Sequence, residues 1–532
     1  MSKKFETYIL SFFILFIIYC AIISGSFWDE NFEMTMGKER LKYLFSLGDY
    51  KNYDFYNSRF YPGFYNTIAA FLTKMFPAKF ESEIWRISNA SFSVLAIFGI
   101  YKIVSNLFNK HVGKIVFVLT ILNPVFFGHM IMNSKDTVLV FAHVWTTYLF
   151  IKYLQNQNNK EKIKRYVLLA GLSVGLGTGI RFPFLVTLFP LFIFSIFDIF
   201  FLKKIICKNF SFTKFLFHLI LILITSYFVA VSFWPHVHSN IFVEPFKLLM
   251  TQINGDVFGV QWILFNGLIY DTKEMPYYYL ITHFFYKSPE FLLLGFFAFT
   301  FFLISNRKFF FYKFNHFFTK IILILFIILF PLIYFIFLPY RVYDGLRLFL
   351  YIIPYFCIIP GIGIYYCIKN FHSSISKAFA GGFFFLFIYF LFIFFTLTPF
   401  QYTYLNLFAG DYSKANQKFE NDYLSISIKE LINKIPSETN LLSSNQKIKL
   451  SFCGVSHMSA RKELDKLNSL KYEIKDLQNN DFDYVIMTNR AVENRNNNTI
   501  DSTVSCFDKI NGENLIEVRR RGLLLSTLRK VN

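Results

Sequence analysis

Long apolar segments separated by short polar connections fill the first 400 residues of the chain. A helix needs about 20 apolar residues to cross the hydrocarbon core of a bilayer. On that measure the pattern predicts about eleven membrane spans, near 8–27, 87–107, 114–130, 137–154, 166–180, 183–202, 215–233, 290–305, 321–338, 348–367 and 378–398. The pair at 166–202 also fits one kinked or re-entrant hairpin, broken around Arg181 and Pro183.

The tail from about residue 400 is polar and has no spanning segment. Residues 422–435 show helical periodicity, and residues 447–453 and 483–488 have the pattern of strands. We therefore expect an α-helical polytopic membrane domain over 1–400, with a long first outer loop at 28–86 that holds interfacial helices. A small exoplasmic α/β domain is expected over 401–532.

Composition supports the membrane class. The chain is 55% hydrophobic and only 17% charged, and a soluble domain could not bury that much apolar surface. The first apolar segment follows two lysines and lacks a small-residue cleavage site, so we interpret it as a retained span rather than a signal peptide.

The positive charge indicates orientation. The amino terminus and the connections 106–114, 155–165, 203–214, 306–320 and 369–377 contain 18 lysines and arginines but only two acidic residues. Such loops face the cytoplasm, and the odd number of spans then places the carboxyl terminus outside. The formal charge of +20 is mostly this topology signal together with contact to anionic lipid, so no nucleic-acid partner is predicted.

The cysteines and histidines indicate no committed metal site. His236 and His238 with Glu244 could bind a metal, but interfacial polar residues are the favoured interpretation. We predict no cofactor, and a divalent metal stays possible. Cys453 and Cys506 share the outer tail, where a disulfide and two free thiols both stay open.

Two acidic residues, Asp29 and Glu30, directly follow the first span, on the predicted outer face. An acceptor hydroxyl or amine that attacks a sugar carried by a lipid phosphate needs a general base, which Asp can supply. The phosphate leaving group is already anionic, so it needs cations rather than a second acid. One essential carboxylate with several basic residues nearby therefore fits this reaction.

The outer ends of other spans offer the required cations. Lys287, Arg341 and Arg347 lie there, although each alone could simply reach the headgroups. Arg181 lies near membrane depth and needs a partner such as Asp29, Asp136 or a phosphate. Further candidates for substrate binding are Lys135, Asp136, Tyr343 and Asp344. Asp136 could instead cap the following helix, and Asp344 could pair with Arg341 or Arg347.

Six short motifs occur in the order found in one superfamily. They are Trp28-Asp29-Glu30, Arg59–Gly63, the stretch from Asn123-Pro124 to Asp136, Tyr286-Lys287-Ser288-Pro289, Tyr343–Arg347 and Tyr404–Tyr423. Over residues 1–425 this order resembles the GT-C membrane glycosyltransferases, especially protein O-mannosyltransferases and lipid A aminoarabinose transferases. The resemblance implies that Asp29 acts as the base and that Glu30 shapes the site.

We therefore predict an inverting glycosyltransferase in the bacterial inner membrane, with a periplasmic carboxyl terminus. Its expected partners are a polyprenyl-phosphate-linked sugar donor, membrane lipid, and a glycolipid, glycan or protein acceptor. Asp29 and Glu30 are the predicted catalytic residues. A lipid-linked-sugar flippase or secondary transporter is the alternative, although we find no internal repeat of the kind transporters show. A third possibility is a non-catalytic envelope assembly protein that acts through its tail.

Overall fold

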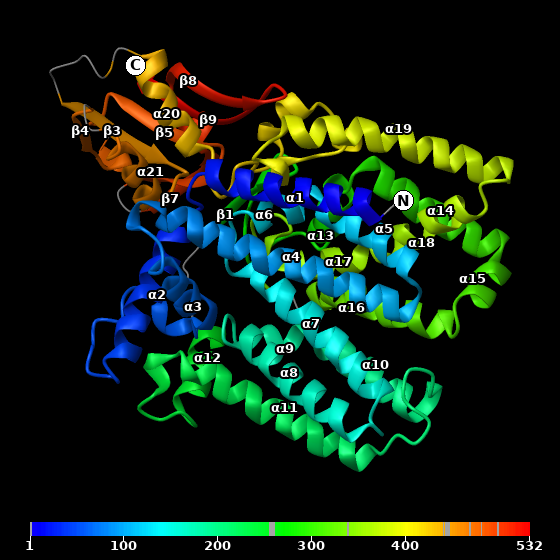
Figure 1. Cartoon of the computed structure of the whole chain (residues 1–532). Helices are drawn as coiled ribbons and strands as arrows, with labels where there is room; N and C mark the ends of the chain where they lie inside the picture. Colours follow the sequence, from blue (N-terminus) through cyan, green and yellow to red (C-terminus); the bar gives the residue numbers. More distant parts are fainter. Residues whose placement is uncertain are drawn as a thin grey trace.

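A computed structural model describes residues 3–254, 261–337, 340–439, 441, 447–467, 470–479, 481–496 and 499–531. Its first half is almost entirely helical (Figure 1). The helices are α1 (Lys3–Ile23), α2 (Glu30–Phe45), α3 (Phe64–Thr73), α4 (Glu81–Leu107), α5 (Lys110–Ile121), α6 (Pro124–Met130), α7 (Asp136–Gln155), α8 (Lys160–Thr178), α9 (Phe184–Thr187), α10 (Phe189–Phe197) and α11 (Phe212–Ser232).

The middle of the chain adds one short hairpin to further helices. The hairpin consists of β1 (Trp262–Phe265) and β2 (Leu268–Asp271). The helices are α12 (Glu244–Asn254), α13 (Tyr279–Tyr286), α14 (Glu290–Ser305), α15 (Arg307–Lys313), α16 (Phe317–Phe337), α17 (Ile353–Phe356), α18 (Ile358–Lys369) and α19 (Ser374–Thr396).

Polar side chains fix where several of these helices begin. Asn109, Asn159 and Ser211 precede α5, α8 and α11, and each side chain accepts a hydrogen bond from a backbone N–H of the first turn. Such caps satisfy donors that have no partner inside the helix. These caps therefore fix the first residue of each of the three helices.

The predicted spans correspond to helices of the structure. In the described residues, eight helices are long and apolar enough to cross a membrane, or ten if two bent pairs count as one span each. The bent pairs are α5 with α6 and α13 with α14. The predicted span at 166–180 lies in α8, which begins with Lys160-Glu161-Lys162 and includes Lys164 and Arg165. These charges keep α8 out of that count, which considers length and composition alone.

The C-terminal part contains the strands that the sequence pattern predicted. Five strands form one sheet in the order β4-β3-β5-β9-β8, in which β3, β4 and β5 are parallel and β9 is antiparallel to β5 and β8. The strands are β3 (Ile448–Cys453), β4 (Tyr472–Ile474), β5 (Tyr484–Thr488), β8 (Gly512–Arg520) and β9 (Leu523–Val531). Helices α20 (Ile428–Glu438), α21 (His457–Leu464) and α22 (Cys506–Lys509) accompany them, with a separate hairpin of β6 (Ala491–Asn496) and β7 (Thr499–Ser505).

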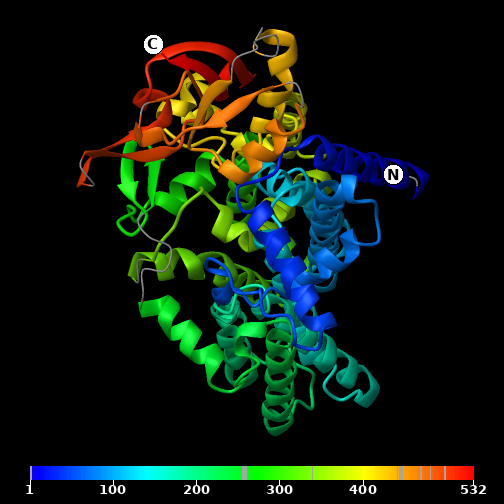
Figure 2. The same cartoon turned by 90° about the vertical axis from the view of Figure 1, so that its left-hand side faces the viewer.

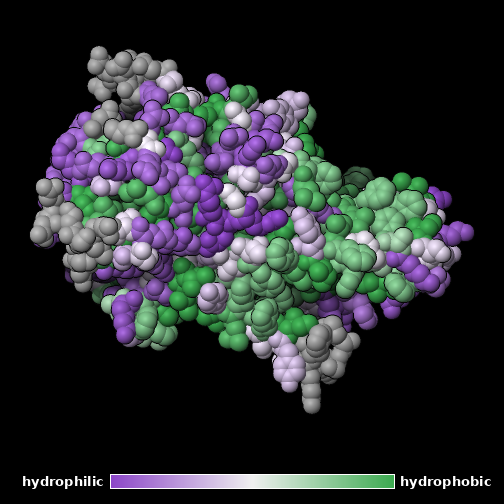
Figure 3. Space-filling model, turned by 90° about the horizontal axis from the view of Figure 1, so that it is seen from above, coloured by the Kyte–Doolittle hydropathy of each residue, from purple (hydrophilic) through white to green (hydrophobic). Residues whose placement is uncertain are grey.

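The C-terminal sheet and the long apolar helices occupy different parts of the molecule. The C-terminal sheet lies at the left in Figure 1, the same end as α2, α3 and α12, whereas the amino terminus lies at the far end of α1. Figure 2 shows the sheet stacked over one end of the helical part. Hydrophilic residues gather over this end in Figure 3, and hydrophobic residues cover the opposite part. The protein is therefore an integral, multi-pass membrane protein with one large polar end.

The C-terminal domain is attached directly to the end of the first helix. Lys429 on α20 donates from its ammonium group to the backbone oxygens of Ile22 and Ser24, at 2.8 and 3.2 Å. A Cβ added to Gly25 would lie 2.3 Å from the backbone oxygen of Ile426. The close approach requires glycine at this point, so the domain rests against the segment that leads into Trp28-Asp29-Glu30.

Candidate functional site

A cavity of about 2040 Å³ opens between the helical part and the C-terminal domain. Of the ten site residues predicted from the sequence, eight line it, namely Asp29, Lys135, Asp136, Arg181, Arg341, Tyr343, Asp344 and Arg347. They come from segments that lie far apart in the chain, between positions 29 and 347. Helix packing has therefore assembled most of the predicted residues in one place.

Asp29 lies at the start of α2, where its backbone oxygen accepts a hydrogen bond from the N–H of Glu33 at 2.9 Å. Its side chain is 28% exposed. One carboxylate oxygen, Oδ2, lies 2.5 Å from Arg347 Nη2 and 3.6 Å from Lys135 Nζ. The other oxygen takes part in neither contact, so the carboxylate is paired and still partly accessible.

Arg347 is the centre of the cluster. Its Nε donates to Asp136 at 3.0 Å, its Nη1 to Asp344 at 2.9 Å and its Nη2 to Asp29 at 2.5 Å. A guanidinium has enough donors in one plane to hold several carboxylates at once, which an ammonium group cannot do in the same geometry. Asp344 and Gly345 have positive φ angles of 55° and 63°, and this sharp turn returns the chain so that Asp344 meets Arg347.

Lys135 joins Asp29 to a second carboxylate that the sequence reasoning missed. Glu33, fully buried, lies 3.1 Å from Lys135 Nζ and accepts a hydrogen bond from Ser134. Glu33 stands four residues after Asp29, and residues at this spacing share one face of a helix. That spacing was the available signal for Glu33.

The neighbouring charges determine the protonation of these groups. Burial alone would raise the pKa of the Asp29 carboxyl, but Lys135 and Arg347 outweigh burial and hold that pKa well below its usual range. Burial would lower the pKa of Lys135, whereas Asp29 and Glu33 raise it above its usual range. Asp29 is thus an ionised carboxylate over the whole physiological pH range.

Arg181 and Asp136 form the opposite side of the cluster. Arg181 Nη2 lies 3.0 Å from Asp136 Oδ1, and the arginine side chain is 24% exposed. Its Nε is buried and has no hydrogen-bond partner among the described residues. Asn133 Nδ2 donates to Asp136 at 2.9 Å. Arg181 therefore retains donor capacity beside the cavity, which an anionic group could satisfy.

Two predicted site residues do not line the cavity. Glu30 is fully buried and pairs with Arg86 at 3.0 Å, and Ser26 donates to it at 2.8 Å. Lys287 is 4% exposed and donates to the backbone oxygen of Tyr402 at 2.9 Å. Both side chains fix backbone segments next to the cavity, so neither is placed where it would touch a substrate there.

Arg490 is a second residue that the sequence reasoning missed. It lies between β5 and β6 in the C-terminal domain and lines the same cavity. Its Nη2 lies 3.4 Å from Asp344 Oδ1. A single arginine in a polar tail carries no local pattern that would distinguish it from a solvated one, so the sequence offered no signal for it.

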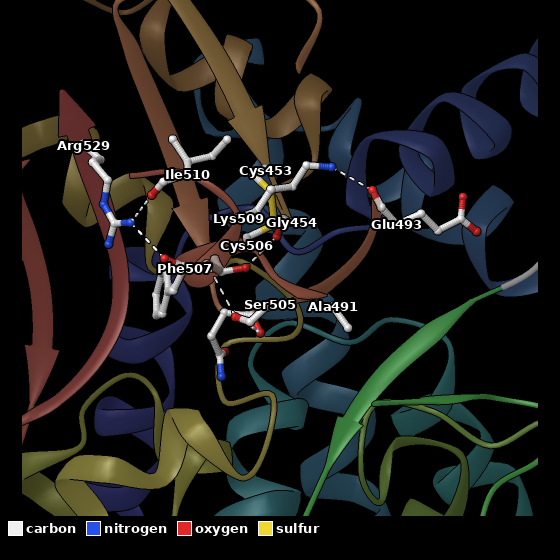
Figure 4. Close-up of a disulfide and its surroundings, with 12 residues drawn as sticks. Cys453, Gly454, Ala491, Glu493, Ser505, Cys506, Phe507, Lys509, Ile510 and Arg529 are labelled. Atoms are coloured by element: carbon white, nitrogen blue, oxygen red, sulfur yellow. Dashed lines mark hydrogen bonds between the residues drawn. A yellow bond between two sulfur atoms is a disulfide. The ribbon is translucent and has the colours of Figure 1, made fainter. Parts of the chain in front are cut away.

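The C-terminal domain also closes a disulfide beside the cavity. Cys453 and Cys506 are bonded, and Cys453 and Gly454 both line the cavity (Figure 4). The same view shows Lys509 donating to the backbone of Glu493, and Arg529 donating to Phe507 and Ile510 on the other side of the disulfide. Of the two states that the sequence left open, the structure has the disulfide.

The described residues contain no group of three or more His, Cys, Asp and Glu side chains arranged to hold a metal ion. His236 instead lies 3.3 Å from Asp54, and the ring of His238 lies 3.0 Å from the hydroxyl of Tyr43.

A buried carboxyl at the junction of the two parts makes the stability of the fold depend on pH. Glu420 is 6% exposed and accepts hydrogen bonds from the backbone N–H groups of Leu264 and Ala491. Burial raises its pKa to about 7, against the lowering effect of Arg490. The folded pKa exceeds the unfolded one, so this contribution is fully present below about pH 4 and is lost as the pH rises through about 7.

We expect Glu420→Gln to flatten this dependence. From pH 5 to 8 this group by itself should lower the apparent melting temperature of the wild-type protein in detergent, by an amount equivalent to at most about 3 kcal/mol. The Gln variant should lose a clear part of that fall, because it has no proton to release. Glu438→Gln, at an exposed position of α20, serves as the control and should keep the wild-type slope. Equal slopes in all three proteins would contradict the prediction.

Comparison with known proteins supports the resemblance found in the sequence. Residues 62–234 match the family model of dolichyl-phosphate-mannose-protein mannosyltransferases. ArnT from Cupriavidus metallidurans, solved bound to undecaprenyl phosphate, aligns over 99% of this chain and 98% of its own, with a TM-score of 0.54 and 8% identity. An oligosaccharyltransferase from Archaeoglobus fulgidus aligns over 90% of this chain and 68% of its own, with a TM-score of 0.40 and 12% identity.

No curated protein matches the sequence. The predicted resemblance is confirmed, and the chain has the fold of the GT-C membrane glycosyltransferases.

Proposed function

We propose that this protein is an inverting glycosyltransferase that moves a sugar from a polyprenyl-phosphate donor to an acceptor at the outer face of the membrane. The observation that carries the proposal is the ionised Asp29, partly exposed in a large cavity and surrounded by Lys135, Arg181 and Arg347. The undecaprenyl phosphate bound to the structurally similar ArnT supports a lipid phosphate as the leaving group.

The reaction needs one displacement. An acceptor oxygen or nitrogen attacks the anomeric carbon and forms the new glycosidic bond, while the bond from that carbon to the phosphate oxygen breaks. The phosphate leaves with the bonding electron pair, and the acceptor proton passes to Asp29. Because the leaving group is an anion, no second acid is required. The charged residues that line the cavity near Asp29 are accordingly mostly cations.

Donor binding would also make Asp29 a better base. Before a donor binds, Lys135 and Arg347 hold the pKa of Asp29 far too low for efficient proton abstraction. A donor phosphate competes for the same two cations. As they turn towards it, their hold on the carboxylate weakens and the pKa of Asp29 rises. The base would thus become active when the donor is in place.

The remaining residues have distinct expected roles. Arg181, with its unpartnered Nε, and Arg341 and Lys135 would bind the phosphate, a contribution of several kcal/mol in a poorly hydrated site. Asp136 and Tyr343 also line the cavity and would contact sugar hydroxyls. Glu30 and Lys287, given their buried partners, would instead hold the backbone of the site.

We further propose a bacterial inner membrane location, with the amino terminus in the cytoplasm and the C-terminal domain in the periplasm. The lysine-rich connections that the sequence pattern assigns to the side of the amino terminus support this orientation, because such loops face the cytoplasm. The disulfide in the C-terminal domain also suits an oxidising compartment.

A transfer assay tests the function. Purified protein in proteoliposomes is given undecaprenyl phosphate carrying a radiolabelled hexose or pentose, each tested separately, with delipidated envelope fractions as acceptor. We expect label in the acceptor and an equal amount of free undecaprenyl phosphate. Arg181→Gln should raise the KM for the donor about tenfold and change kcat less. Label that crosses the bilayer while still attached to lipid would indicate a flippase, and the absence of both results would contradict the proposal.

A further inference from the structure

We propose that Arg490, supplied by the C-terminal domain, is a positioning residue for the transfer reaction. It would hold Asp344 and Trp28 in the positions in which Arg347 keeps its hydrogen bond to Asp29. This inference rests on the proposed function, because it assigns a role within the same site. It also makes the C-terminal domain part of the active site rather than an appended module.

The guanidinium of Arg490 contacts three separate segments of the chain. Its Nη2 lies 3.4 Å from Asp344 Oδ1, and its Nη1 donates to the backbone oxygen of Tyr423. Its central carbon lies 4.8 Å from the centre of the Trp28 ring, within the range of a cation–π interaction. With 18% of its side chain exposed, Arg490 joins the first outer loop, the 343–347 turn and the C-terminal domain.

Two of these contacts lead directly to Asp29. Asp344 is 2% exposed, and its other oxygen accepts a hydrogen bond from Arg347 Nη1 at 2.9 Å. A carboxylate so deeply buried needs more than one cationic partner to offset its loss of hydration. Without Arg490, Asp344 would draw Arg347 towards itself and away from Asp29. Trp28, the other partner, immediately precedes Asp29 in the chain.

The backbone around Arg490 is held on both sides. The N–H of Cys506 donates to the Arg490 oxygen at 2.9 Å, and the N–H of Ala491 donates to Glu420 at 2.8 Å. The Asn489 side chain donates to the backbone oxygens of Asn416 and Phe419, at 3.0 and 2.7 Å. Arg490 is therefore presented to the cavity by a rigid segment, and little conformational entropy is lost in holding it there.

The disulfide is part of this support. A Cβ added to Gly454, next to Cys453, would lie 2.7 Å from the Cβ of Arg490, and Cys506 provides the hydrogen bond to the Arg490 backbone. Both halves of the disulfide thus adjoin Arg490. The disulfide therefore lies directly beside the segment between β5 and β6 that presents Arg490 to Asp344.

The decisive test compares two arginines of the same domain. Arg529 also donates to backbone oxygens, beside the disulfide, but does not line the cavity (Figure 4). We expect Arg490→Gln to lower kcat about 30-fold, with the KM for the donor changed less than about threefold. Arg490→Lys should recover part of the loss, because an ammonium group can still pair with Asp344. Arg529→Gln should keep kcat within about threefold of wild type.

A double-mutant cycle separates positioning from general support of the fold. If Arg490 acts through Asp344, then Arg490→Gln should lower kcat less than about threefold further in an Asp344→Asn background. Independent, multiplying effects would overturn the proposal. Melting temperatures are measured for every variant, and if Arg490→Gln fails to fold, Arg490→Lys replaces it in the cycle.

The outcomes distinguish this inference from the function it rests on. A wild-type protein that transfers no sugar would overturn the proposed function and this inference together. An active wild-type protein in which Arg490→Gln behaves like Arg529→Gln would overturn this inference alone.

Discussion

Replacing Asp29 by Asn is expected to lower kcat about 10³-fold while the affinity for the donor stays the same or increases. Asn has the size of Asp but cannot accept the acceptor's proton, so the chemical step loses its base. Arg347 keeps Asp136 and Asp344 as partners at 3.0 and 2.9 Å and becomes more available to the donor phosphate. Loss of kcat without a higher KM for the donor is therefore the expected signature of this variant.

The measurement is the transfer rate with a labelled polyprenyl-phosphate sugar, alongside binding of undecaprenyl phosphate. Asp54→Asn is a matched control, because Asp54 lies in the same outer loop and pairs with Arg59 at 2.8 Å, but does not line the cavity. It should keep nearly full activity. Activity that survives in both Asp29→Asn and Asp29→Ala would show that Asp29 is not the base.

Arg347→Gln is expected to remove both activity and stability. The arginine compensates three carboxylates, of which Asp136 and Asp344 are 4% and 2% exposed. Removing the partner of a buried charge costs about 3–5 kcal/mol, so a lower melting temperature should accompany a fall in kcat/KM of at least about 10³-fold. Arg347→Lys should regain part of the stability but little of the activity, because an ammonium group cannot span the three carboxylates.

Thermal unfolding in detergent and the transfer assay measure the two effects separately. Arg59→Gln breaks an ion pair between side chains that are 49% and 42% exposed and should change stability by less than about 1 kcal/mol. If Arg347→Gln resembles Arg59→Gln in both measurements, the central position assigned to Arg347 is wrong.

The local sequence patterns predicted where helices and strands form, but they did not predict which residues these elements contact. Residues 447–453 and 483–488 contain β3 and β5, because an alternating pattern in the first and a short apolar run in the second both favour a strand. The predicted helix at 422–435 begins later, at Ile428, since Asp422 folds back to accept hydrogen bonds from the backbone N–H groups of Ile426 and Ser427. A side chain that bonds the nearby backbone competes with a helix, and periodicity does not reveal it.

For the site, the sequence could identify candidates but not their partners. Asp29, the 343–347 turn and Lys135 stood out because charges beside apolar spans are costly and rarely accidental. Glu30 and Lys287 stood out for the same reason, yet each is buried against its own partner, Arg86 and the Tyr402 backbone. The free-energy cost of placing a charge beside an apolar span does not show whether that charge binds a substrate or stabilises the fold.

The sequence by itself determined the membrane class, the approximate spans and the end of the molecule that holds the acidic motif. These follow from the length of apolar segments and the distribution of lysine, which act locally along the chain. Only the tertiary structure decided that Arg347 lies on Asp29, 318 residues away in the chain, and that Arg490 reaches Asp344 from the C-terminal domain. Such contacts depend on how whole helices and a sheet pack, and no local pattern of residues encodes that packing.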